Sequence, residues 1–564
     1  MQHTVRRSLA AAAAVAAVVF AAAAGAQTPA VVPPASELAP PLVTPSRPSL
    51  PAQPAPAPEL GKPEDDIRVD VTRYEVDAGA PAELVAALPA LTARYTGKDR
   101  GFEDLVNAAA EVTRYLQREL GYYLGYAYLP AQAPEGGVIR IAVLEGRLDK
   151  VVLNWTDGLP VDRSVVESYL EKLVPGSILR VRDVERVVFL VNDLRGLTTR
   201  FEVRAGAAPG TAQLVVTPRA ESLWSGKADV DSNGSRFLGT YRVGGLVQRN
   251  SPFGRGDGVT ANVLASTTGG LAFALVGYNT PVGGDGFKVG TSLSAVRYQL
   301  DKEIFPLDLN GTATTTNVYG LYPLVRSRNL NLFTLLSAEH KSYEDRNVVS
   351  RTRKTVDTLT LGSTGDFRDS FACGGVSTFD FSLMAGRVRF QEGSNGGLDE
   401  PSFRKLLFGY TRLQDVVTGR MLAYLSVRGQ WTTKNLDTTE QFRLGGPDGI
   451  RAYAPGEGTS DRGGIATLEL RLLPPEDWFG RIAREMVASV FYDWGKIQYR
   501  VTPPNGEERP NVDTFSAAGI GLAWVRPGEY ALRFSLAKPI AGTPRSDDAV
   551  KDPRLYLQAT KFFN

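Results

Sequence analysis

The feature that most constrains the fold is an alternation of apolar and polar residues that runs from about residue 221 to the C-terminus. In the stretch IATLELRLL, for example, apolar residues alternate with Thr467, Glu469 and Arg471. Successive side chains of a β-strand point to opposite faces of the sheet, so this spacing predicts strands with one apolar and one polar face. The segments DGVTANVLAST and YALRFSLAK follow the same rule.

Two architectures fit such strands. A soluble sandwich turns its apolar faces inward, whereas a membrane barrel turns them outward to lipid and lines its lumen with the polar faces. The strands recur over residues 221–564, which is too long for one sandwich core. At roughly 20 residues for each strand and its connection, this region gives about 16 strands, within the range of outer-membrane barrels. We therefore expect a transmembrane antiparallel β-barrel, whose closure pairs every backbone group in the lipid.

The N-terminus predicts export from the cytoplasm. Arg6 and Arg7 precede an apolar stretch that ends in the small-residue site Ala24-Gly25-Ala26, the pattern of a secretory signal peptide over residues 1–26. No later apolar run approaches the roughly 20 residues of a spanning helix. Residues 27–66 contain 12 of the chain's 36 prolines and are expected to form an extended linker. We expect this linker to provide a weak helical plug for the barrel, or none.

Residues 67–220 change pattern and are predicted to form two copies of a small α+β unit, over 67–145 and 146–220. In the first, the strand pattern IRVDVTRYEV precedes two segments with helical spacing, PAELVAALPALTARY and GFEDLVNAAAEVTRYLQREL, and two further strand patterns follow. The same order of a strand, two helices and two strands recurs from KVVLNW to TAQLVVTPRA. Repeated units of this kind commonly share one binding role.

The composition leaves little material for catalysis or metal binding. Cys373 is the only cysteine, and His340 is the only histidine beyond the signal peptide. Asp229-x-Asp231-x-Asn233-Gly234 begins like a calcium loop, but its twelfth position is Thr240 rather than glutamate, so a strand turn is the better interpretation. A net charge of +2 gives no basic field for nucleic acid. We expect no enzyme, no metal site and no cofactor.

Several motifs in family order make the chain resemble the two-partner secretion transporters, the haemolysin-activator branch of the outer-membrane insertase superfamily. Residues 121–148 (GYYLGYAYLPAQAPEGGVIRIAVLEGRL) resemble the end of that family's first polypeptide-transport-associated (POTRA) domain. Residues 174–197 resemble the second POTRA domain, and residues 229–245 resemble the entry into the barrel. The resemblance implies two periplasmic POTRA domains followed by a 16-stranded outer-membrane barrel.

The resemblance also assigns a role to the glycine-rich stretch LGGPDGIRAYAPGEG, which lies in a long connection over 432–464. The family has an Arg-Gly-Tyr motif on an extracellular loop that folds into the barrel, and Arg451-Ala452-Tyr453 follows Gly445 and Gly446 here. Ala452 replaces the usual glycine, which tolerates positive φ better than alanine does.

The family motif Phe-x-Asp-x-Gly appears here as Phe491-Tyr492-Asp493-Trp494-Gly495. Alternation turns Phe491 and Asp493 to the lumen, where Asp493 can bind Arg451 as a planar two-point partner. Glu469 is also expected to line the lumen. Since the loop is rich in glycine, we expect little packing of its own and a hold that depends on this ion pair.

The resemblance implies a transporter whose POTRA domains recognise an unfolded partner exoprotein, which then leaves through the barrel. Tyr122, Tyr126, Pro130 and Gln132 are candidate contacts for that partner, although tyrosines at such positions more often pack in a core or at a sheet edge. Further implied partners are outer-membrane lipid and the barrel-assembly machinery that inserts the chain. The alternatives are a barrel-assembly insertase, which usually carries more POTRA domains, and a porin-like solute channel, which has no reason to carry any.

Overall fold

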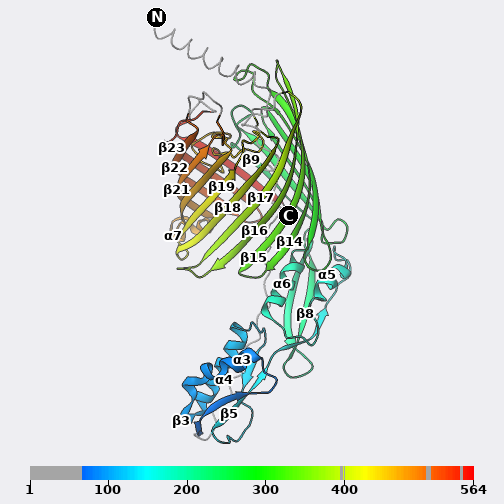
Figure 1. Cartoon of the computed structure of the whole chain (residues 1–564), viewed down its shortest axis with the longest axis vertical. Helices are drawn as coiled ribbons and strands as arrows, with labels where there is room; N and C mark the ends of the chain where they lie inside the picture. Colours follow the sequence, from blue (N-terminus) through cyan, green and yellow to red (C-terminus); the bar gives the residue numbers. More distant parts are fainter. Residues whose placement is uncertain (1–66, 394–397, 399, 504–509, 546–550, 564) are drawn as a thin grey trace.

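The computed structural model describes residues 67–393, 398, 400–503, 510–545 and 551–563. The predicted signal peptide, the proline-rich linker and the question of a plug helix fall on residues 1–66 and lie outside the described residues. Within the described part of the chain, two α+β modules precede a large β-barrel, and the modules follow one another below one end of it (Figure 1). No helix in this part is both long and apolar enough to span a bilayer.

Sixteen antiparallel strands, β9 to β24, close into the barrel, with β24 paired to β9. This confirms the predicted fold class. The strands are β9 (Trp224–Asp231), β10 (Arg242–Asn250), β11 (Gly258–Ser266), β12 (Leu271–Pro281), β13 (Lys288–Gln299), β14 (Asn310–Arg326), β15 (Leu330–Arg346), β16 (Arg351–Asp369), β17 (Gly375–Glu392), β18 (Ser402–Val417), β19 (Met421–Thr432), β20 (Arg462–Leu472), β21 (Met486–Gln498), β22 (Val512–Arg526), β23 (Tyr530–Ala541) and β24 (Arg554–Phe563). A short helix, α7 (Glu476–Phe479), and the 3-10 turn η2 (Gly480–Glu485) lie between β20 and β21.

Side chains alternate across the barrel wall as the sequence predicts. On β21, Val490, Tyr492 and Trp494 are exposed on the outside, whereas Phe491 and Asp493 are buried on the inside. An outward apolar face suits lipid, and an inward polar face suits a lumen. Asn233-Gly234 lies in the connection between β9 and β10.

The first module contains two sheets and two long helices. The elements are β1 (Arg68–Val71), β2 (Arg73–Val76), α3 (Ala82–Thr92), η1 (Ala93–Tyr95), β3 (Gly97–Gly101), α4 (Phe102–Arg118), β4 (Tyr126–Tyr128) and β5 (Val138–Leu144). The prediction of one strand over IRVDVTRYEV is wrong in detail, because β1 pairs with β3 whereas β2 pairs with β5. The break falls at Thr72, whose N–H donates to the Gly137 carbonyl at 2.8 Å.

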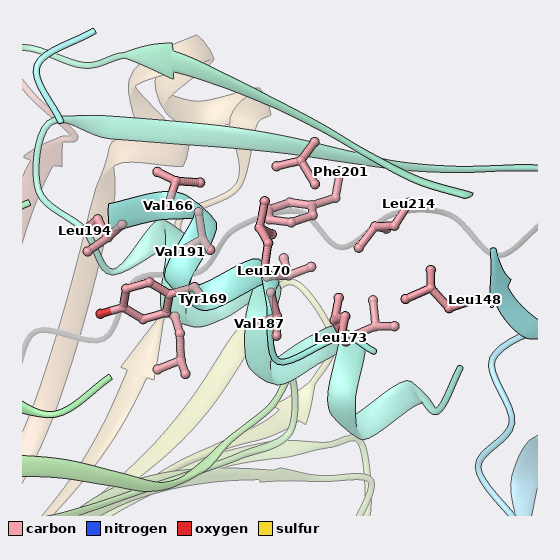
Figure 2. Packing of buried hydrophobic residues seen from close by; sticks show 14 of the residues in the cluster. Leu148, Val166, Tyr169, Leu170, Leu173, Val187, Val191, Leu194, Phe201 and Leu214 are labelled. Atoms are coloured by element: carbon pink, nitrogen blue, oxygen red, sulfur yellow. The ribbon is translucent and has the colours of Figure 1, made fainter. Parts of the chain in front are cut away.

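The second module has the predicted order of elements: β6 (Arg147–Leu153), α5 (Arg163–Leu170), α6 (Val181–Asn192), β7 (Leu197–Ala205) and β8 (Thr211–Ala220). Its sheet has the order β6-β8-β7, with β8 in the centre. Figure 2 shows the core, in which Tyr169 and Val187 from the helices lie below Phe201 and Leu214 of the sheet. The helices supply apolar residues at helical spacing, and burying that face stabilises the module.

The two modules share a short junction. Tyr122 is buried in the core of the first module, and the next residue, Tyr123, is buried in the core of the second. The Tyr123 N–H donates to the Leu179 carbonyl at 2.8 Å, and the Val181 N–H donates to the Gly121 carbonyl at 2.9 Å. Since adjacent residues belong to different cores, the modules have no flexible linker between them.

The second module also contacts the barrel rim directly. Arg326, at the end of β14, is fully buried and donates to both carboxylate oxygens of Asp193, at 2.7 and 2.9 Å. Its guanidinium lies 4.7 Å from the ring centroid of Phe189 on α6. Arg186 of α6 bonds Asp285 in the turn after β12 at 3.1 Å. The second module is therefore fixed to the rim of the barrel that bears these turns.

Candidate functional site

The connection between β19 and β20, residues 433–461, folds against the inner wall of the barrel. Its apolar side chains are buried in one cluster with residues of the wall strands β20 to β23. The loop contributes Phe442, Leu444, Ile450, Ala452 and Tyr453, and the wall contributes Ile465, Phe491, Ile497, Phe515, Ala517 and Ala537. The expectation that this loop has little packing of its own is therefore wrong. The glycines allow close approach, and the apolar residues between them supply the packing.

Arg451 and Asp493 are brought together at the centre of this contact. The Arg451 guanidinium donates from Nε to Asp493 Oδ2 at 2.9 Å and from its second terminal nitrogen to Oδ1 at 2.8 Å. The Arg451 backbone N–H donates to Oδ2 at 3.1 Å. Asp493 is completely buried, and Thr467 on the neighbouring strand donates to its Oδ1 at 2.9 Å. The carboxylate is thus fully occupied by charge-assisted bonds, the strong kind of hydrogen bond.

The guanidinium has two further partners. It donates to Glu469 of β20 at 2.8 Å, and it lies on the face of Phe491, 3.3 Å from the ring centroid. Glu469 also accepts from Arg471 at 2.9 Å. Sequence reasoning assigned Glu469 only to lumen lining and missed its bond to Arg451. Once β20 and β21 are paired, Glu469 lies opposite Phe491 and next to the Thr467–Asp493 pair, and this register could have indicated the bond.

Tyr453 lies on the far side of the same turn. Its hydroxyl donates to the Ala541 carbonyl at 2.7 Å, and its ring packs edge-on against Phe515, with ring centroids 5.0 Å apart. Tyr556 of β24 donates back to the Tyr453 carbonyl at 3.1 Å. Tyr453 therefore connects the loop to the last strands of the barrel, whereas Arg451 connects it to β20 and β21.

The three predicted motif glycines each have a distinct role in the geometry. Gly446 has φ of 123°, in the region that favours glycine, and its N–H closes the turn on the Tyr453 carbonyl. A Cβ on Gly445 would lie 2.4 Å from the Ala454 carbonyl oxygen. A Cβ on Gly495 would lie 2.9 Å from Ile450, so glycine at this place on β21 makes room for the loop.

Ala452 fits its place without left-handed backbone. Among the described residues, the non-glycine positions with positive φ are Asp99, Ser251, Asp308 and Ala372. Ala452 is absent from that set and is buried in the cluster. The doubt that its methyl group raises about the turn is removed, because the turn does not require positive φ at this position.

A second group of contacts connects the start of the loop to another part of the wall. Lys354 of β16 is fully buried and donates to both oxygens of Asp437, at 2.9 and 3.0 Å. Glu440 is bound by Lys341 of β15 and Lys405 of β18, each at 2.9 Å. Sequence reasoning missed this second anchor, because lysines at inward positions look the same as ordinary lumen lining. The loop is thus bound to the wall at two separated places.

The loop leaves part of the lumen open. A cavity of about 350 Å³ lies between the glycine turn and the first strands of the barrel. Asp229, Asp231 and Arg242 line it from β9 and β10, and Gly446 and Asp448 line it from the loop. The cavity is therefore lined by charged residues of the first strands and by the glycine turn of the loop.

The candidate partner contacts in the first module are in different environments. Tyr122 is 4% exposed and belongs to the core, so its side chain is corrected from a surface contact to packing. Tyr126 is half-buried on β4 and stacks with Tyr128 at 6.3 Å between ring centroids. Pro130 is half-buried, and Gln132 is exposed. The Gln132 amide exchanges two hydrogen bonds with the Arg140 backbone, at 2.7 and 2.8 Å, and so covers the stretch of β5 that lies beyond the end of β4.

Comparison with known proteins agrees with this architecture. The family model for the haemolysin secretion/activation protein ShlB/FhaC/HecB matches residues 210–523, and the model for the ShlB-type POTRA domain matches residues 69–146. The heme/hemopexin transporter protein HuxB of Haemophilus influenzae (strain 86-028NP) is 24% identical over 498 residues, which cover 86% of each chain. The outer membrane transporter CdiB of Escherichia coli O6:K15:H31 (strain 536 / UPEC) is 24% identical over 435 residues, 75% of this chain and 72% of that one.

Solved structures share the fold. CdiB from Escherichia coli superposes with a TM-score of 0.68 at 19% identity, covering 91% of this chain and 94% of that one. BamA from Haemophilus ducreyi lacking POTRA domains 1-3 gives a TM-score of 0.52 at 14% identity, covering 88% of this chain and all of that one. Because the first family model spans more than half of the chain, this protein belongs to the haemolysin secretion/activation family of two-partner secretion transporters of the outer membrane.

Proposed function

We propose that this transporter captures an unfolded exoprotein on its two periplasmic modules, residues 67–145 and 146–220, and passes it through the lumen beside the loop 433–461. It acts without enzymatic activity of its own, after insertion by the barrel-assembly machinery. The observation that carries the proposal is the loop bound by Arg451 to Asp493 inside a closed barrel. The partner exoprotein is of the class that two-partner secretion transporters bind.

The capture site is the outer edge of β7 in the second module. Thr199 lies opposite Pro218 of β8, which has no N–H to donate, so Thr199 forms a non-hydrogen-bonded pair with it. The backbone groups of Thr199 therefore point away from β8, and by alternation so do those of Phe201 and Val203. An open edge of this kind accepts an extended chain as an added strand.

Side chains cover the equivalent edge in the first module. The Thr113 hydroxyl of α4 accepts a hydrogen bond from the Ala127 N–H of β4 at 2.9 Å, and the Gln117 amide donates to the Gly125 carbonyl at 3.0 Å. Gln132 continues this cover along β5. On β7 the comparable cap, Asn192 of α6, reaches only Thr199. This contrast favours the second module for strand addition and leaves the first module for side-chain contacts near Tyr126 and Pro130.

The position of the second module suits delivery to the lumen. Its contacts through Arg326 and Arg186 fix it on the periplasmic rim beside β12 to β15. A chain added to β7 is consequently held at a fixed place relative to the barrel mouth. Binding sites on rigid elements lose less free energy to ordering than mobile ones do.

The loop works as a latch that holds itself to one side of the lumen. Its binding to β20, β21, β15, β16 and β18 leaves the polar cavity beside β9 and β10 for the moving chain. A loop released from the wall crosses this passage, so the ion pair of Arg451 is needed for export even though it takes no chemical part.

The test of capture is Val203→Pro, with Val203→Ala as the matched control. Proline removes the outward N–H of β7 but leaves the bonds to β8, and edge positions tolerate it. Exoprotein in the culture medium should fall about tenfold or more with Val203→Pro, as expected for loss of a strand-pairing register. Val203→Ala should export normally, and both variants should show the heat-modifiable migration of a folded barrel. Normal export by Val203→Pro would remove β7 as the capture edge.

A barrel-assembly insertase is the alternative role for this architecture, and the likeness to BamA concerns the fold alone. Reconstitution of the chain in a membrane distinguishes the two roles. The transporter moves its exoprotein across the membrane and does not speed insertion of an unrelated barrel. Accelerated insertion of that barrel without export would favour the insertase.

A further inference from the structure

We propose that a shallow groove on the outer wall of β14 to β17 binds the phosphorylated sugar headgroup and an acyl chain of a glycolipid in the outer leaflet of the membrane. The proposal rests on the outer-membrane location of the barrel and is independent of how the exoprotein is captured or exported. It assigns a specific lipid contact to charged residues that neither the lumen nor the periplasmic modules use.

The groove has a volume of about 600 Å³, and its surface is mostly apolar with polar and charged residues along one part of its lining. Strand register places its lining in two neighbouring rows that run across the wall. The lower row is Val318, Ala338, Leu359 and Ala385, and the upper row is Thr316, His340, Asp357 and Arg387. Small side chains at Ala338 and Ala385 leave the lower row hollow, so an acyl chain can lie there.

The two rows lie at the outer boundary of the apolar band. The next row of lipid-facing residues on the periplasmic side contains Leu336, Leu361 and Leu383, all exposed. The periplasmic end of these strands is fixed by the contact of Arg326 with the second module. His340 and its row therefore lie toward the cell exterior, where an apolar band about 25 Å tall gives way to lipid headgroups.

The upper part of the groove carries an excess of positive charge. Arg387 and Arg389 point outward from β17, and Arg404 of β18 lies opposite Ala385 in the register. Among the lipid-facing residues that share a register row with one of these three arginines, Asp357 is the single acidic side chain. It bonds both His340 at 2.6 Å and Arg389 at 2.9 Å. Within the part of the chain that the structure describes, neither Arg387 nor Arg404 takes part in an ion pair.

This arrangement matches one class of ligand. Guanidinium groups bind phosphate through paired N–H donors, and a headgroup phosphate at this height is within their reach. The apolar row below takes the hydrocarbon that a free phosphate ion lacks. The groove consequently recognises a ligand with both parts, which is a phosphorylated glycolipid rather than an inorganic anion.

The experiment measures lipid retained by the detergent-purified full chain in native mass spectrometry, with bisphosphorylated lipid A as the probe. Each basic residue near a membrane surface contributes about fivefold in affinity, so Arg387→Gln with Arg389→Gln should lower retention on the order of twentyfold. Arg420→Gln with Arg481→Gln removes the same charge from exposed residues in periplasmic turns and should leave retention unchanged. Heat-modifiable migration shows that each variant is folded.

Two further measurements test the effect of Asp357 on binding and the part of the lipid that the groove recognises. Asp357→Asn should raise retention several-fold, because it removes the acid that competes for Arg389. The wild type should retain dephosphorylated lipid A no better than the arginine double variant retains bisphosphorylated lipid A. Inorganic phosphate should not displace the intact lipid. Equal retention by the wild type and that double variant, equal retention of dephosphorylated lipid, displacement by phosphate, or no gain with Asp357→Asn would each overturn the proposal.

Discussion

Arg451 of the lumenal loop and Asp493 of β21 are joined by three hydrogen bonds, two from the guanidinium and one from the Arg451 backbone. Asp493 is fully buried, and the Arg451 side chain is 12% exposed. Losing one partner of a buried ion pair leaves the other charge without compensation, which costs about 3–5 kcal/mol. The pair is therefore a sensitive point in the attachment of the loop, although apolar packing shares that task.

The two acidic partners of Arg451 should differ in importance. Asp493→Ala should reduce export strongly, because it removes three bonds and leaves Arg451 with Glu469 and the Phe491 ring. Glu469→Gln should reduce export only about twofold to threefold, since a neutral hydrogen bond can still form there and net hydrogen bonds contribute about 1 kcal/mol. Exoprotein in the medium, normalised to folded barrel, gives the order. Equal losses from both variants would contradict the dominance of Asp493.

The packing of the loop can be tested without touching a charge. Gly495→Val should displace the loop, because a Cβ at this position meets Ile450 at 2.9 Å and Leu444 at 3.0 Å. Overpacking of this kind typically costs about 1–3 kcal/mol. Gly464→Val is the matched control, because its Cβ meets only the Arg428 carbonyl oxygen at 3.7 Å. Trypsin added to intact cells should cleave the loop in Gly495→Val and spare it in Gly464→Val. Equal protection in both would show that packing at Gly495 does not position the loop.

The second anchor predicts rescue by exchange of charge. Lys354→Glu should expose the start of the loop to protease, since it places a second acid beside the buried Asp437. Combining it with Asp437→Lys restores opposite charges and should recover at least part of the protection. Lys302→Glu, which changes an exposed partner of Asp308, controls for net charge. If the combined variant is no better than Lys354→Glu alone, the pair does not anchor the loop.

The contact between the second module and the barrel should depend on burial. Arg326→Gln removes a fully buried arginine from Asp193 and should loosen the module by about 3–5 kcal/mol. Arg328→Gln, which removes an exposed arginine 3.8 Å from Glu185, should change the attachment by less than about 1 kcal/mol. Distances between spin labels on the second module and the rim report the change. Unbroadened distances with Arg326→Gln would mean that the module is held by other contacts.

Strand alternation made the barrel predictable, because the lipid face forces one residue in two to be apolar. The same parity predicts that Phe491 and Asp493 face the lumen, and the family resemblance supplied Arg451 as the partner. The height of the loop relative to the wall depends on the packing of Leu444 and Ile450 against Phe515, which is distant from them in the sequence. For that reason, the bond to Glu469 and the lysine anchor could not be predicted.

In the modules, local spacing predicted both helices of each unit. It could not show that Tyr122 turns into one core and Tyr123 into the other, because that depends on how the two modules meet. The break of the first strand at Thr72 likewise depends on a contact with Gly137, far along the chain. Edge cover by Thr113 and Gln132 became visible only once the strands were paired.

We propose that Arg451 and Asp493 act together as the latch that export requires. The most direct test of this proposal is export by Arg451→Ala, Asp493→Ala and the double variant, with heat-modifiable migration as the control for folding. Arg451→Ala should reduce exoprotein in the medium about tenfold or more, and Arg451→Lys should recover only part, because an ammonium lacks the planar two-point contact. The double variant should be little worse than Arg451→Ala, since both changes remove one interaction. Export at the wild-type level by Arg451→Ala, or losses from the two single variants that simply multiply, would contradict the latch.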